Sequence, residues 1–193
     1  NHLQIIFAPD ADLLKQCSDR MNSSCDFFIT DIKSIRTGRA TTNLLENIKI
    51  NYHGSSMPLN QLSQISVSDQ RSLIVQPWDK TAVDLISKGI QSSDLGIIPQ
   101  IEGDVLRVNI PPMTEETRKN VVKMLKQRSE QSKVSIRNVR RDIQDEIRKL
   151  EKEGSCSEDD SRRAISELQK LTDQSIKIID EQSSSKETEI MQV

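Results

Sequence analysis

The stretch that decides the fold is "PPMTEETRKNVVKMLKQRSEQSKVSIRNVRRDIQDEIRKLEKEG", Pro111–Gly154. After the stiff proline pair, Thr114 is a good N-cap residue, and the glutamates that follow suit the positive end of a helix dipole. Apolar side chains then recur on one face, at Val121, Leu125, Ile136, Val139, Ile143, Ile147 and Leu150. The pattern predicts a helix of about 60 Å at 1.5 Å per residue, from 114 to about 153.

Two further helices are predicted on either side of this one. Between residues 11 and 35 an apolar stripe with helical spacing precedes Gly38, a plausible stop. Its members are Leu14, Cys17, Met21, Cys25, Phe28, Ile32 and Ile35. Ser157, with Asp160 three residues later, resembles a capping box that starts a third helix, with Leu168, Leu171 and Ile178 on its apolar face. Because no such helix buries a narrow stripe alone, the three must pack as a bundle.

The segment between Arg39 and Ile110 has a different pattern. Short β-rich runs, "NIKINYHG", "QISV", "RSLIVQPW", "GIIPQI" and "VLRVNI", are separated by turns and by one helical stretch at 80–91. The predicted fold class is α+β, a long three-helix bundle (11–38 and 111–193) with an inserted small α/β domain (39–110). Residues 1–10 are interpreted as a processed leader, an organellar remnant or a disordered extension.

The chain crosses between the two predicted domains twice. The crossings are a hinge or, equally well, two stiff connectors that fix one angle. The hinge hypothesis involves Thr37, Gly38, Arg39, Ala40, Pro111 and Pro112.

Composition limits the classes of function. Hydrophobic residues make up 34% of the 193 and aromatic residues only 3%, and the formal net charge is −2, so a polyanion partner requires a local basic patch. The three cysteines form no CxxC pair, which argues against structural zinc and favours free thiols packed in a core. No apolar run approaches a membrane span of about 18 residues. P-loop, GxSxG and HExxH motifs are absent, so neither enzymatic activity nor a cofactor is expected.

The helix at 114–153 is itself basic. It has twelve basic and eight acidic residues, an excess of four positive charges. Seven of the cations fall within roughly 80° of arc, and Arg140 lies at the border with the apolar face. We call these seven residues the basic stripe: Lys119, Lys123, Lys126, Lys133, Arg137, Arg141 and Arg148.

The stripe has two interpretations. A solvated face held by i,i+4 pairs would use Arg141–Asp145 and Lys126–Glu130, which leaves Lys133 and Arg137 without a counter-charge. The like charges of Lys133 and Arg137, four residues apart, repel each other. A nucleic-acid partner explains better why such a pair is kept. Duplex or folded RNA is favoured over a single strand, because the helix lacks aromatic stacking residues.

With these features together, the chain resembles the ribosome recycling factor family. The resemblance rests on "IRTGRA", "SDLG", "PPMTEETRK", "VRRD", "SEDDSRR", "QKLTD" and "KETEIMQV", in that order, and covers residues 11–193. It implies an L-shaped monomer that binds a bacterial-type 70S ribosome through large-subunit ribosomal RNA. It also implies action with elongation factor G and GTP, which splits the subunits and releases messenger RNA and deacylated transfer RNA.

The resemblance also implies roles for particular residues. The family's RNA-contacting arginines match Arg118, Arg137 and Arg140, and the arginines of its IRTGRA motif match Arg36 and Arg39. One departure is Thr117, where the family commonly has a second arginine. The predicted RNA-binding residues are Arg118, Lys126, Lys133, Arg137, Arg140 and Arg141.

Alternatives remain at this point. One is a helical adaptor for an acidic protein, and another is a relative that binds ribosomes without splitting them. A bacterial cytoplasm is the expected setting, with an organelle matrix or stroma as the alternative.

Overall fold

The structure, a computed structural model, describes residues 9–192 and divides into two compact units. Of the described residues, the first unit contains 9–32 and Lys123–Glu187, and the second contains Lys33–Val122 and 188–192. The α+β class is confirmed: the first unit is helical and the second carries the strands. The chain passes from one unit to the other at 32/33, 122/123 and 187/188 rather than at 38/39 and 110/111, so the predicted division at a hinge stays a prediction.

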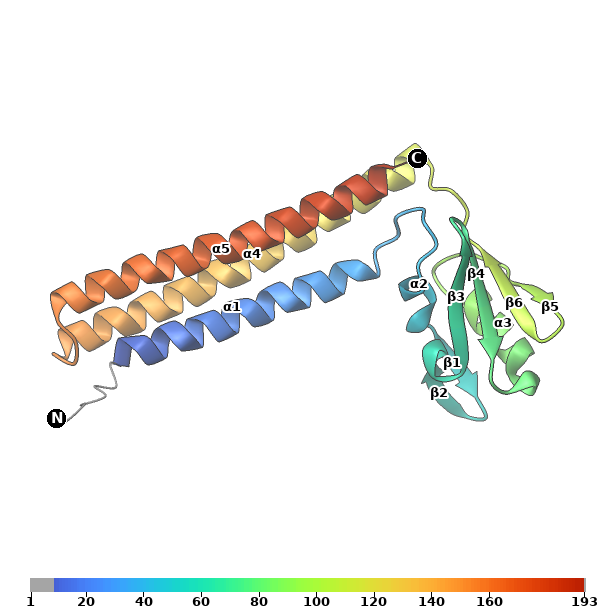
Figure 1. Ribbon diagram of the computed structural model, residues 1–193, viewed down its shortest axis with the longest axis horizontal. Helices are drawn as coiled ribbons and strands as arrows, with labels where there is room; N and C mark the ends of the chain where they lie inside the picture. Colours follow the sequence, from blue (N-terminus) through green and yellow to red (C-terminus); the bar gives the residue numbers. More distant parts are fainter. Residues whose placement is uncertain (1–8, 193) are drawn as a thin grey trace. The chain divides into compact units, whose positions relative to one another are not determined.

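Three long helices supply the first unit: α1 (Pro9–Lys33), α4 (Glu115–Lys152) and α5 (Glu158–Met191). They run side by side in this part of Figure 1. The predicted stripe of α1 is confirmed, because Cys17, Met21, Cys25, Phe28 and Ile32 are buried. The stripe of α4 is confirmed as well. Its buried residues are Leu125, Ser129, Ile136, Val139, Ile143 and Ile147.

The buried face of α5 differs from the prediction at one position. Ile178 is 38% exposed, and its neighbour Ile179 is fully buried instead. The face is marked largely by small residues, which a search for large apolar side chains overlooks. It comprises Ser161, Ala164, Leu168, Thr172, Ser175 and Ile179. The Thr172 hydroxyl donates to the Leu168 carbonyl at 2.8 Å, so a buried polar group is satisfied within the helix.

Local sequence sets the helix ends. The Thr114 hydroxyl accepts the Thr117 amide at 3.1 Å, and Ser157 accepts the Asp160 amide at 3.0 Å, so both predicted N-caps form. At the other end of α4, Gly154 has φ +77°. The Gly154 amide bonds the Glu151 carbonyl at 3.1 Å and the following amide bonds Leu150 at 2.9 Å, a Schellman motif that turns the chain into α5.

The second unit contains a four-stranded antiparallel sheet of order β3-β4-β6-β5 and a β1-β2 hairpin. Each predicted β-rich run overlaps a strand, whereas β2 and α2 were not predicted. The elements are α2 (Asn43–Glu46), β1 (Lys49–Tyr52), β2 (Ser55–Pro58), η1 (Leu59–Gln61), β3 (Ser63–Asp69), β4 (Ser72–Pro77), η2 (Lys80–Ala82), α3 (Val83–Gln91), β5 (Gln100–Glu102) and β6 (Val105–Asn109).

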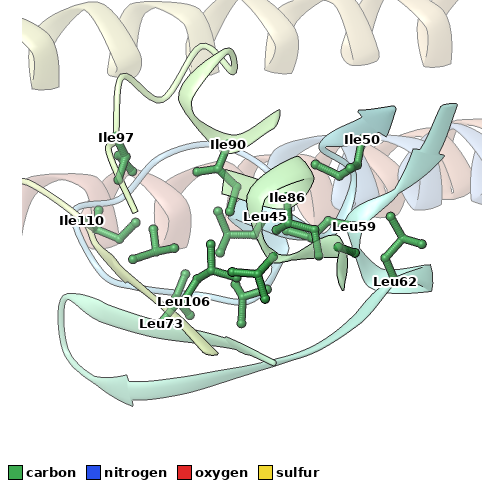
Figure 2. Close-up of a cluster of buried hydrophobic side chains, with 14 of the residues drawn as sticks. Leu45, Ile50, Leu59, Leu62, Leu73, Ile86, Ile90, Ile97, Leu106 and Ile110 are labelled. Carbon is green, nitrogen blue, oxygen red and sulfur yellow. The ribbon is translucent and has the colours of Figure 1, made fainter. Parts of the chain in front are cut away.

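The core of this unit lies between α3 and the strands (Figure 2). Ile86 and Ile90 of α3 and Leu73 and Leu106 of the sheet are fully buried. The helix approaches β1 closely at Gly89, where a Cβ atom would lie 2.2 Å from the Ile50 Cδ1 atom. A side chain at position 89 would therefore force the tip of the Ile50 side chain to shift.

Candidate functional site on helix α4

One flank of helix α4 lies against α1, and polar side chains of the two helices pair across this contact. Arg128 pairs with Asp31 of α1 at 3.4 Å, and Asp142 pairs with Arg20 at 3.1 Å. Between them, Ser135 shares a hydrogen bond of 3.2 Å with a serine of α1. The three α4 positions are seven residues apart, which places them on one line of the helix. The charged side chains on this flank therefore stabilise the packing of α4 against α1.

The opposite flank of α4 lies against α5. Lys126 pairs with Glu187 at 3.8 Å, and Lys133 pairs with Asp180. Each step of seven residues along α4 corresponds to a step of seven backward along α5, as expected for antiparallel helices. The next step in this register places Arg140 opposite Asp173.

The expected third pair is not made. Asp173 instead accepts a hydrogen bond of 2.9 Å from the Gln169 side chain of its own helix. Within residues 9–192, Arg140 has no ion pair. Its side chain is half-buried, in agreement with the predicted position at the border of the apolar face. The series of ion pairs between α4 and α5 therefore stops at Arg140, whose guanidinium group no described carboxylate neutralises.

The ion pairs correct one part of the sequence analysis. Lys133 and Arg137 were expected to lack a counter-charge, but Lys133 pairs with Asp180, and Arg137 pairs with Glu130 at 2.9 Å. The expectation was wrong because it considered only i,i+4 partners. Glu130 lies seven residues from Arg137, and Asp180 lies on another helix.

The two expected i,i+4 pairs are also absent from the described residues. Lys126 turns to Glu187 rather than to Glu130, and Arg141 makes no ion pair with Asp145. Arg141 is exposed, and so is Arg148 one heptad later. Three arginines that make no ion pair with a described residue, Arg140, Arg141 and Arg148, thus lie in the C-terminal part of α4.

Arg118, at the start of α4, belongs to the second unit, whereas the other predicted RNA-binding residues belong to the first. Its Nε atom is buried and has no hydrogen-bond partner among the described residues. It lines a cavity together with Arg39 and Arg71. Sequence patterns gave no sign of this cavity, because it joins α4 to the turn between β3 and β4.

The predicted hinge residues are held within the second unit. Ala40 donates its amide to the Gln70 carbonyl at 2.8 Å, and Arg36 donates to the Pro111 carbonyl at 2.9 Å. Thr37 is buried, and Gly38 has φ +81°, a conformation that favours glycine. Pro112 and Arg39 line the cavity described above. Motion at these residues stays a prediction.

Metal-ligating side chains and cysteines are further candidates for a functional site among the described residues. These residues contain no group of three or more histidine, cysteine and acidic residues able to hold a metal ion. Burial raises the pKa of the Cys17 and Cys25 thiols above the usual value, so these groups stay protonated and pack as apolar side chains. Within 9–192, no helix is long and apolar enough to cross a membrane.

Comparison with known proteins adds to this geometry. The family model described as ribosome recycling factor matches residues 28–191. The ribosome-recycling factor of Symbiobacterium thermophilum is 42% identical over 182 residues, 94% of this chain and 98% of the relative. That of Paraburkholderia phymatum is 45% identical over 183 residues, which is 95% of this chain and 98% of the relative.

Solved structures agree. A solution structure of a ribosome recycling factor is similar with a TM-score of 0.76 and 39% identity, and the match covers 95% of this chain and 98% of that one. A second structure contains models of the T. thermophilus ribosome recycling factor and the E. coli elongation factor G bound to the E. coli post-termination complex. It matches with a TM-score of 0.66 and 41% identity, over 95% of this chain and 99% of that one.

Proposed function

The chain belongs to the ribosome recycling factor family, and on that premise we propose that it is a translation factor of the post-termination ribosome. It binds a bacterial-type 70S ribosome through large-subunit ribosomal RNA. With elongation factor G and GTP it separates the subunits, which releases messenger RNA and deacylated transfer RNA. A bacterial cytoplasm is the proposed setting, with an organelle matrix or stroma as the alternative.

The observation that carries the proposed RNA contact is the unpaired Arg140. Its neighbours in the same register, Lys126 and Lys133, are both neutralised across the bundle. A guanidinium group presents a planar fork of donors that matches two phosphate oxygens. Because Arg140 is half-buried, packing holds its stem, and less side-chain freedom is lost when it binds phosphate.

Arg141 is the second proposed contact. It is exposed, adjacent to Arg140 and without an ion pair among the described residues. The two guanidinium groups point from neighbouring positions, about 100° apart around the helix, which suits two phosphates of a folded RNA. Lys126, Lys133 and Arg137 are assigned weaker roles, since each must leave a carboxylate to meet RNA.

The chemistry of GTP belongs to the partner in this proposal. The sequence has no GxxxxGK[ST] loop that would cradle phosphates, so the chain acts as a translation factor without its own hydrolytic site. Elongation factor G acts on the α/β domain, which is proposed to move at Thr37–Ala40 and at Pro111 and Pro112. The bundle then transmits the force to the contacts between subunits.

The test compares Arg140→Ala with the matched control Arg162→Ala, an exposed arginine of α5 outside the proposed surface. Loss of charge-assisted hydrogen bonds is expected to weaken binding to 70S ribosomes about ten- to a hundredfold. The dependence of log affinity on log salt is expected to decrease by about one unit of slope. The control is expected to keep both affinity and slope, and circular dichroism checks that both variants fold.

A second assay separates the alternatives. Light scattering follows the separation of subunits after elongation factor G and GTP are added with the wild-type chain. Binding without separation would identify a ribosome-binding relative that lacks splitting activity. Absence of binding to isolated large subunits would favour a helical adaptor for an acidic protein and would refute the proposed function.

A further inference from the structure

A cavity of about 390 Å³ in the second unit has an unusual lining. It contains Arg39 from the segment after α1, Arg71 from the turn between β3 and β4, and Arg118 from the start of α4. All three residues fall within the same compact unit. We call it the three-arginine cavity.

The charges around this cavity are not balanced. Among the described residues that line it, none is acidic, and the polar ones include Thr37 and Gln70. Arg39, Arg71 and Arg118 make no ion pair with any described residue. Three guanidinium groups around one concave surface repel each other and concentrate positive potential in the hollow.

Arg118 gives an independent sign of a missing partner. Its Nε atom is covered by protein and has no hydrogen-bond acceptor in the described structure. A buried donor without an acceptor is unfavourable, and more so when it belongs to a charged group. Arg118 also lines the cavity, so an anion placed there lies beside a positively charged residue whose Nε atom is already covered by protein.

Backbone hydrogen bonds hold the loops that carry Arg39 and Arg71. The Arg71 carbonyl accepts the Ile110 amide at 2.6 Å, and the Gln70 carbonyl accepts the Ala40 amide at 2.8 Å. Thr37, on the other side of Arg39, is 5% exposed. The loops that carry Arg39 and Arg71 are therefore tied together, which lowers the cost of ordering them around a ligand.

We propose that the three-arginine cavity binds one phosphate-type oxyanion. Such a group offers several acceptor oxygens and a negative charge, which together balance the three arginines that line the cavity. The phosphate belongs either to a small free anion or to an RNA backbone. The RNA source rests on the proposed function, whereas the free-anion source is independent of it.

The first experiment measures binding of inorganic phosphate to the full chain by isothermal titration calorimetry at constant ionic strength. Thermal unfolding in phosphate and in chloride is followed alongside. Arg71→Gln and Arg118→Lys are each expected to weaken phosphate binding about ten- to a hundredfold. Arg162→Gln, which removes an exposed arginine elsewhere, is expected to bind phosphate like the wild type.

Phosphate also stabilises proteins in general by exclusion from their surfaces. The informative quantity is therefore the difference between variants at low millimolar phosphate, where that general effect is equal. Arg71 is exposed, so its substitution leaves folding intact even if substitution of Arg118 does not.

The second experiment measures the affinity of a fluorescent RNA hairpin by anisotropy. If free phosphate has no effect but Arg71→Gln lowers RNA affinity at least fivefold relative to Arg162→Gln, the phosphate comes from RNA. If phosphate and RNA both bind Arg71→Gln as they bind the wild type, the cavity is not an oxyanion site. Because Arg71 lies outside the α4 surface, a failure here leaves the Arg140 result unaffected, and an Arg140→Ala chain that keeps its response to phosphate separates the two proposals.

Discussion

The two flanks of helix α4 carry similar polar side chains but use them differently. Toward α1, Arg128 and Asp142 are each neutralised by a partner on the other helix. Toward α5, Lys126 and Lys133 are neutralised in the same way, but the series stops at Arg140. A single interrupted position distinguishes charge that holds the bundle together from charge that remains available to a ligand.

One glutamine bonds the carboxylate at the interrupted position. Asp173 stands where the register of the helices would provide a partner for Arg140, and Gln169 occupies its carboxylate. Arginine is thus kept in a setting that is half-buried yet free of a counter-charge. The same principle applies to Arg118 in the second unit, whose buried donor also lacks a partner among residues 9–192.

The largest effect on stability is expected from a substitution in the buried apolar face of α4, which lies between the two flanks. Ile143 is 2% exposed, and Ile143→Ala is expected to lower the free energy of unfolding by about 2–5 kcal/mol, because a cavity remains in the core. Chemical denaturation measures the loss. Ile178→Ala, at a position that is 38% exposed, is the control and is expected to cost less than about 1 kcal/mol. Equal losses would contradict the assignment of the buried face.

A medium effect, on ribosome affinity, is expected when Asp173 is made free to pair with Arg140. Gln169→Ala frees the Asp173 carboxylate to pair with Arg140, which then competes with RNA phosphate. Ribosome affinity is expected to fall about two- to fivefold, the range of an exposed ion pair.

The control for this change is Gln174→Ala, at a neighbouring exposed position of α5. Adding Asp173→Asn to the Gln169→Ala chain is expected to restore ribosome affinity, because the competing charge is gone. Affinity that stays low in the double variant would show that Gln169 acts in another way.

The smallest effects are expected from the paired lysines. Lys133 is 20% exposed and Lys126 is 65% exposed. Lys133→Met is expected to cost about 0.5–1 kcal/mol of stability, and Lys126→Met less than about 0.5 kcal/mol. Both are expected to change ribosome affinity less than twofold. Thermal and chemical denaturation compare the two stability losses, and ribosome binding is measured on the same samples. A larger affinity loss than for Arg140→Ala would contradict the assignment of the paired lysines to bundle stability and of Arg140 to RNA binding.

Much of this architecture could be predicted from local sequence. The stripes of α1 and α4 follow from large apolar residues at helical spacing, and Thr114, Gly154 and Ser157 mark the ends. The face of α5 was harder, because Thr172 and Ser175 are buried although they are polar. A small hydroxyl that bonds its own backbone has no signature in hydrophobic periodicity.

The site could be predicted only in part. Helical projection places Arg140 at the border of the apolar face, and the structure agrees. Whether that arginine is paired depends on the register between α4 and α5, which no single helix encodes. The three-arginine cavity lies further from prediction, since Arg39, Arg71 and Arg118 come together only through the tertiary fold.

The bundle also has a consequence for synthesis on the ribosome. Helix α1 ends at Lys33, but its partners α4 and α5 end at Lys152 and Met191. At 5–20 residues per second, α1 waits on the order of ten seconds for α5 to be completed. Until α4 and α5 emerge, Met21 and Phe28 lack the helices that bury them in the finished bundle, whereas α4 and α5 are joined directly by the turn at Gly154. The hairpin of α4 and α5 is therefore expected to fold first and to receive α1 last, so the oldest helix in the nascent chain is the one most exposed to chaperones.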